Sequence, residues 1–77
     1  MTPEELKQLI TDNMDTLDIE VKGDGSKFEV EIVSAAFDGL NTIKRHQLVY
    51  KITNPYISTG EIHALTIRAH TSAEQNG

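Results

Sequence analysis

The sequence predicts an α+β fold of two layers, in which helices cover one face of a three-stranded mixed sheet. Apolar residues first recur at helical spacing, then alternate with polar residues in two segments, and return to helical spacing before a last alternating segment. A short turn between the first two strands favours an antiparallel hairpin. A helical crossover before the third strand favours a parallel, right-handed connection. The expected order is helix, strand, strand, helix, helix, strand.

The first segment carries the signals of a helix start. Thr2 is a capping residue, Pro3 suits the first helical position, and Glu5 completes a capping box. One apolar stripe with helical spacing follows, formed by Leu6, Leu9, Ile10 and Met14. The sequence therefore predicts an amphipathic first helix.

Two alternating segments predict a β-hairpin. Between them, Gly23-Asp24-Gly25-Ser26 supplies the turn, because glycine adopts positive φ without steric cost. Each strand is expected to bury one apolar face. The apolar positions are Leu17, Ile19 and Val21 in the first strand and Phe28, Val30 and Ile32 in the second.

A connection and a second helix are expected after the hairpin. Phe37 is the expected buried anchor of the connection over 35–39. The helix is predicted over 41–52, with Ile43, Val49 and Tyr50 on its apolar side and a solvated stripe of Lys44, Gln47 and Lys51.

The last third of the chain predicts a short helix, a strand and a tail. Asn54-Pro55 favours a separate helix over 56–59, ended by Gly60. The last strand is expected over 62–69. One face carries His63, Leu65, Ile67 and Ala69, and the other carries Ile62, Ala64, Thr66 and Arg68. A single domain is thus expected over 1–71, followed by a polar, frayed tail over 72–77.

Composition excludes several classes of function. The chain has 77 residues, which suit one small domain with little room for a ligand cleft. Without cysteine it has no disulfide, no thiolate nucleophile and no metal site built on its own sulfur. No serine or threonine has a recognisable base partner, so catalysis is not expected. The chain has no signal peptide pattern and no apolar run of membrane-spanning length, so a cytoplasmic protein without a membrane partner is expected.

The candidate for metal chemistry is His63, beside the glycine-rich turn. If the second and third strands run parallel, both begin at the same end of the sheet, which brings His63 next to the turn. A neutral imidazole there can ligate a metal ion. The alternative is that His63 fills the edge of the core with one ring nitrogen hydrogen-bonded. His46 is expected to be half buried and His70 to be solvated.

A second candidate surface is basic. Lys44, Arg45 and Lys51 concentrate positive charge on the second helix and could contact phosphates, or they could form an ordinary exposed face. The net charge of −5 and the lack of a Gly-x-x-Gly loop argue against nucleic acid.

Four segments resemble the BolA-like family, in the same order and at the same separations. They are GDGSKF at 23–28, FDGL at 37–40, KRHQLVY at 44–50 and IHALTI at 62–67. The resemblance runs from the first helix to about Thr71, and the bacterial IbaG (YrbA) branch is the most similar. It implies a fold like a class II KH domain, in agreement with the pattern of elements.

The resemblance also implies a non-enzymatic function. BolA-like proteins partner monothiol glutaredoxins with glutathione and share a [2Fe–2S] cluster with them, in iron–sulfur trafficking or stress response. The family's histidine ligand in the last strand matches His63. The second ligand comes from the loop between the first two strands, where this chain has Lys27 in place of a frequent histidine. Asp24, His70, water or no group remain as alternatives. The implied partner-binding residues are Gly23, Asp24, Gly25, Ser26, Lys27 and His63.

Some family members are described as DNA-binding transcriptional regulators, which gives Lys44, Arg45 and Lys51 an alternative role. For the cluster, physical chemistry adds a constraint. A [2Fe–2S] cluster needs four ligands and a cysteine-free chain supplies no thiolate, so any cluster must be shared with a partner that carries sulfur. The isolated chain is expected to hold none. Because imidazole must lose its proton to bind iron, acid is expected to favour release.

Overall fold

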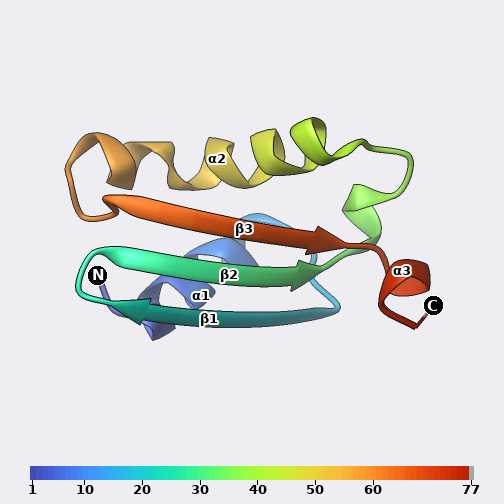
Figure 1. Cartoon of the computed structure of the whole chain (residues 1–77), viewed down its shortest axis with the longest axis horizontal. Coiled ribbons are helices and arrows are strands. Elements are labelled where there is room, and N and C mark those ends of the chain that lie inside the picture. The colour runs from blue at the N-terminus through green and yellow to red at the C-terminus, as the bar shows by residue number, and fades with distance from the viewer. Residues whose placement is uncertain (77) are drawn as a thin grey trace.

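The computed structural model describes residues 1–76 of the chain. Its elements, in order, are α1 (Pro3–Asn13), β1 (Asp18–Asp24), β2 (Lys27–Val33), the 3-10 helix η1 (Ala35–Phe37), α2 (Thr42–Ser58), β3 (Ala64–His70) and α3 (Ser72–Asn76) (Figure 1). Within the described residues, no helix has the length and hydropathy required to cross a membrane.

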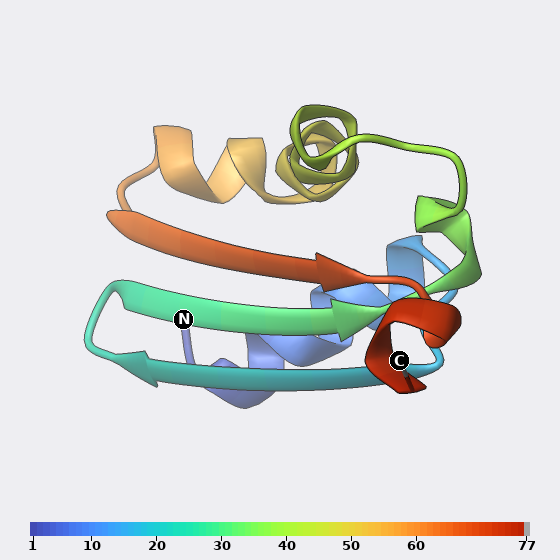
Figure 2. The ribbon, with the colours of Figure 1, turned by 45° about the vertical axis from the view of Figure 1, so that its right-hand side comes forward.

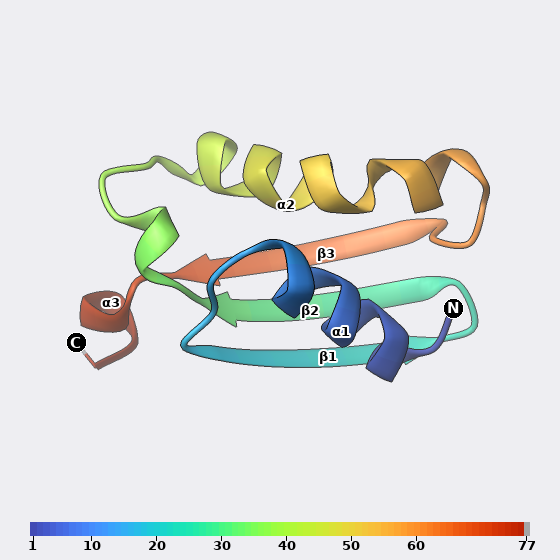
Figure 3. The ribbon, with the colours of Figure 1, turned by 180° about the vertical axis from the view of Figure 1, so that it is seen from behind.

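The sheet has the predicted mixed topology. Its strand order is β1-β2-β3, with β1 antiparallel to β2 and β2 parallel to β3. Seen from behind, α1 lies over β1 and β2, and α2 runs along β3 (Figure 3). The face seen in Figure 1 has no helix over it. The two-layer α+β prediction is therefore confirmed.

The core lies between the sheet and the helices. Phe37 is fully buried, as predicted, and the alternating positions Phe28, Val30 and Ile32 of β2 point inward. The buried cluster consists of Leu6, Ile10, Ile19, Phe28, Val30, Ile32, Phe37, Val49, Ile62 and Ile67. At the start of α1, Thr2 and Glu5 form the predicted capping box, and the hydrogen bonds from Thr2 lower the pKa of Glu5.

The separate helix predicted over 56–59 is wrong, because α2 continues through Pro55 to Ser58. A proline inside a helix removes one backbone hydrogen bond, and tertiary packing can outweigh this cost. Val49 and Thr53 are fully buried on the inner side of α2, and the Thr53 hydroxyl donates a hydrogen bond to the Val49 carbonyl. The burial of this face therefore stabilises the helical conformation of α2 in the turn before Pro55 and offsets the signal for a break.

The frayed tail predicted over 72–77 is helical over Ser72–Asn76. The Glu74 amide donates to the Thr71 hydroxyl at 3.2 Å, and the Thr71 amide donates to the Glu74 carboxylate at 2.9 Å. This is a second capping box, whose signal Thr71-Ser72-Ala73-Glu74 stands in the sequence. Figure 2 shows α3 at the end of the sheet opposite the β1–β2 turn.

Three apolar positions differ from their predicted burial. Leu17 is 65% exposed because β1 begins only at Asp18, and Ile43 is 69% exposed in the first turn of α2. Ile62, predicted on the strand face opposite Leu65 and Ile67, is buried with them; it precedes β3, which begins at Ala64, and so lies outside the alternation of the strand. Leu65, Ile67 and Ala69 share one face, as predicted, and it packs against the core.

Candidate functional site

The β1–β2 turn requires glycine at two positions for different reasons. Gly25 has a φ of +65°, which residues with a side chain rarely adopt. Gly23 lies opposite Phe28 in the hairpin, and a Cβ added there would lie 2.5 Å from the Cδ1 atom of that ring. The hairpin therefore brings its backbone close over a buried ring, which fixes the path of the turn.

Replacing Gly23 by alanine is expected to lower the free energy of unfolding by about 1–3 kcal/mol, because Phe28 is buried and has little room to move. Gly25→Asn is the control, and we expect it to cost about 1 kcal/mol or less, because asparagine tolerates positive φ. Urea unfolding followed by circular dichroism measures both. Equal stability of Gly23→Ala and the wild type would contradict the close approach.

His63 lies beside this turn, as the parallel pairing of β2 and β3 predicts. The His63 amide donates a hydrogen bond of 2.8 Å to the Ser26 carbonyl, and Ala64 pairs with Lys27 in the sheet. The residue precedes β3 and is exposed, so it does not fill the edge of the core. Its ring is placed against Gly60, where an added Cβ would lie 3.3 Å from Nε2. The site thus presents an imidazole to solvent next to the glycine-rich turn.

The two alternative metal ligands lie in different places. Asp24 belongs to the turn and pairs with Lys27 across the hairpin, close to the site. His70 is at the opposite end of β3, roughly 20 Å along the strand from His63, so the two cannot share a metal centre. His70 is also half buried rather than solvated, and its Nε2 lies 3.3 Å from Oε2 of Glu31. His46 is half buried, as expected.

No self-contained metal site is found in the part of the chain that the structure describes. There, no group of three or more His, Cys, Asp or Glu side chains could hold a metal ion. His63 is therefore an exposed donor that is not part of a three-ligand site within the described residues.

Arg45 is not available for phosphate, which corrects its assignment to the basic surface. Its guanidinium donates to both carboxylate oxygens of Glu74, at 2.6 and 2.9 Å, and to the carbonyls of Leu40 and Ala69. Its side chain is only 13% exposed. The Arg45 guanidinium and the Thr71 amide lower the pKa of Glu74 to about 2. Arg45 therefore holds α3 in place, and sequence reasoning missed this role.

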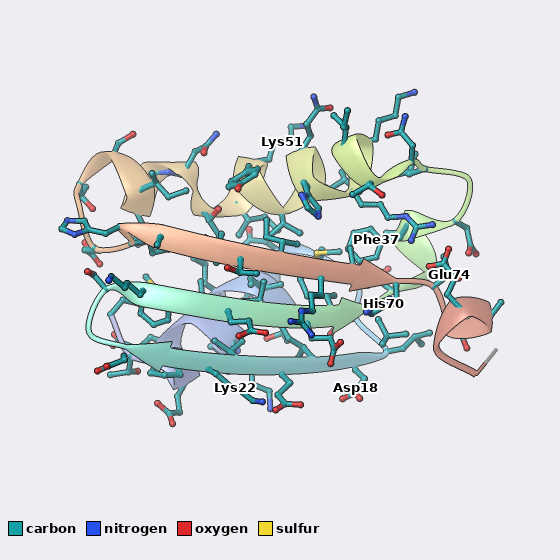
Figure 4. The ribbon with its side chains drawn as sticks, viewed as in Figure 1. Asp18, Lys22, Phe37, Lys51, His70 and Glu74 are labelled. Atoms are coloured by element: carbon teal, nitrogen blue, oxygen red, sulfur yellow. The ribbon has the colours of Figure 1, made fainter. Side chains whose placement is uncertain are left out.

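The uncovered face of the sheet carries charges that pair with one another. Lys22 lies 3.3 Å from Glu20, and Arg68 lies 3.4 Å from Glu29 across neighbouring strands. Figure 4 shows the side chains of this face, with Lys22 on β1 and His70 near the end of β3. Exposed pairs of this kind contribute little to stability, and they indicate a solvated surface.

Known proteins share the sequence and the fold of this chain. A family model described as BolA-like protein matches residues 4–74. The acid stress protein IbaG of Escherichia coli (strain K12) is 36% identical over 74 residues, which are 96% of this chain and 88% of that protein. The BolA domain of SufE1 from Arabidopsis thaliana has a TM-score of 0.84 at 30% identity, covering 94% of this chain and 93% of that one. A bolA protein homologue from Coxiella burnetii has a TM-score of 0.83 at 29% identity, covering 100% and 99%. The chain therefore belongs to the BolA-like family.

Proposed function

We propose that this protein is a non-enzymatic adaptor that binds a monothiol glutaredoxin with its glutathione and ligates a shared [2Fe–2S] cluster through His63. The observation that carries the proposal is the exposed His63 imidazole, held next to the glycine-rich turn by the hydrogen bond from its amide to Ser26. The turn residues Gly23, Asp24, Gly25, Ser26 and Lys27 would form the rest of the contact with the partner.

The side chains of this protein that could bind iron fit a cluster shared with a partner protein, and they do not fit a cluster held by this chain alone. A [2Fe–2S] cluster needs four ligands, commonly cysteine thiolates, and the chain has no cysteine. Within the described residues, no group of three or more His, Cys, Asp or Glu side chains could hold a metal ion, so at least two of the four ligands would come from the partner and its glutathione. Asp24 is the remaining candidate for a second ligand from this chain, whereas the Lys27 ammonium has no lone pair to offer.

The protonation of a histidine ligand and the name of a relative both bear on the biological setting. A histidine ligand releases iron when it is protonated, which suits transfer or sensing better than storage. The E. coli relative is named an acid stress protein. These two points support our proposal that the chain acts in cytoplasmic iron–sulfur trafficking or the stress response.

The proposal is tested by mixing the protein anaerobically with a cluster-loaded monothiol glutaredoxin. We expect the wild type to change the visible absorption and circular dichroism of the cluster, and His63→Ala to lose this change. His70→Gln is the matched control, because it removes a histidine at the opposite end of β3 and should behave as the wild type. Identical spectra and equal affinity for the wild type and His63→Ala would show that His63 is not the ligand.

A further inference from the structure

The outer side of α2 borders two open hollows. One is a groove of about 570 Å³ between α1 and α2, and the other, of about 490 Å³, lies on the flank of α2 beside Leu40. Leu48 and Lys51 line both hollows, so the two form one surface, called here the α2 surface. The sequence predicts little room for a cleft in so short a chain, and this groove corrects that expectation.

The floor of the groove is apolar and comes from both helices. Leu48 and Tyr56 are half buried on α2, and Leu9 and Met14 are half buried on α1. They remain partly exposed because no further element of the described chain covers the groove. The apolar side chains that line it are Leu9, Met14, Leu48, Ile52, Pro55 and Tyr56.

The charge around this floor is positive, in contrast to the rest of the protein. Lys51 borders both hollows and Lys44 borders the second, and no carboxylate of the described chain lines either one. Neither lysine forms an ion pair with the described residues, whereas Lys22, Arg45 and Arg68 all do. Both lysines are exposed, and Figure 4 marks the position of Lys51 on α2. Because the whole chain carries a net charge of −5, this positive surface is a local reversal of charge.

We infer that the α2 surface docks an amphipathic helix of a partner protein, with an apolar stripe that fills the groove and carboxylates that meet Lys44 and Lys51. Helices that lay an apolar face in a hydrophobic groove are anchored by residues at i, i+3, i+4 and i+7. The positive rim selects acidic flanking residues and steers their approach.

Nucleic acid fits this surface less well. Duplex DNA would use the two lysines and leave the apolar floor empty, and Arg45, the third cation on α2, is engaged by Glu74. The α2 surface does not include His63, so this inference does not depend on the proposed cluster.

A synthetic peptide provides the probe. It has leucines at i, i+3, i+4 and i+7, glutamates on both sides of this stripe, and one tryptophan. The protein has no tryptophan, so the fluorescence of the peptide reports binding without background. We expect the glutamate peptide to bind the wild type, and a peptide with lysines in place of the glutamates to bind at least about fivefold more weakly.

Matched variants locate the contact. Lys51→Gln is expected to weaken binding of the glutamate peptide about fivefold, and Leu48→Ala is expected to weaken it at least as much. Lys22→Gln removes the same charge from the sheet face and should change affinity less than about twofold. Far-UV circular dichroism verifies that each variant is folded. Lys51→Glu should restore binding of the lysine peptide, which tests the charge contact directly.

Other occupants would overturn the inference. Failure of the glutamate peptide to bind, or equal losses for Lys51→Gln and Lys22→Gln, contradicts it. Tighter binding of duplex DNA than of the peptide, with a loss in Lys51→Gln, would make this a nucleic-acid surface. A dimer in sedimentation velocity that the peptide dissociates and Leu48→Ala weakens would make a second copy the occupant.

Discussion

Replacing Phe37 by alanine is expected to lower the free energy of unfolding by about 3–5 kcal/mol, because the ring is fully buried and its loss leaves a cavity in the core. A chain of this length has a total stability of only about 4–12 kcal/mol. The variant should therefore be marginally stable at best. Urea unfolding followed by far-UV circular dichroism measures the loss.

Phe37 also anchors the chain between two elements, because it belongs to η1, which connects the end of β2 to the loop before α2. It belongs to the same buried cluster as Val49 of α2 and Ile10 of α1, so the cavity would lie within the core that both helices share. Ile43→Ala is the control: this side chain is 69% exposed, and its loss should cost less than about 0.5 kcal/mol. Similar costs for both variants would contradict the burial of Phe37 in the core.

The sequence determines the layers of this fold more clearly than the ends of its elements. Alternation and helical spacing depend on which face is buried, and they identify α1, β1, β2 and β3 correctly. The continuity of α2 is different, because Asn54-Pro55 is a local signal for a break and the burial of Val49 and Thr53 is a tertiary effect. Local propensity is a weak prior where packing opposes it.

The site was predictable to the extent that it follows from topology. A parallel β2–β3 pair requires His63 to lie beside the β1–β2 turn, and the hydrogen bond from its amide to Ser26 confirms that placement. The role of Arg45 could not be found in this way. Its partner Glu74 is 29 residues distant, and only the folded chain brings the two together. The Thr71–Glu74 capping signal could have predicted α3, but not what it docks against.

Acidification is expected to weaken the docking of α3, because the Arg45–Glu74 contact requires an ionised carboxylate. Two hydrogen bonds from Arg45 and one from the Thr71 amide lower the pKa of Glu74 from an ordinary value of 4.5 to about 2. A carboxyl group whose pKa is lower in the folded state stabilises the fold above its unfolded pKa. That stabilisation is present above pH 4.5 and is lost as the pH falls through 4.5 towards about 2.

Glu74→Gln isolates this contribution. At pH 7 we expect a lower urea midpoint for Glu74→Gln than for the wild type, and near pH 2, where the wild-type carboxyl also becomes neutral, the two midpoints should converge. Glu61→Gln is the control, since its carboxylate makes only a 3.4 Å contact with the Thr59 hydroxyl, and it should change the midpoint little at either pH. A difference between Glu74→Gln and the wild type that stays constant from pH 7 to about 2 would show that charge is not what holds α3.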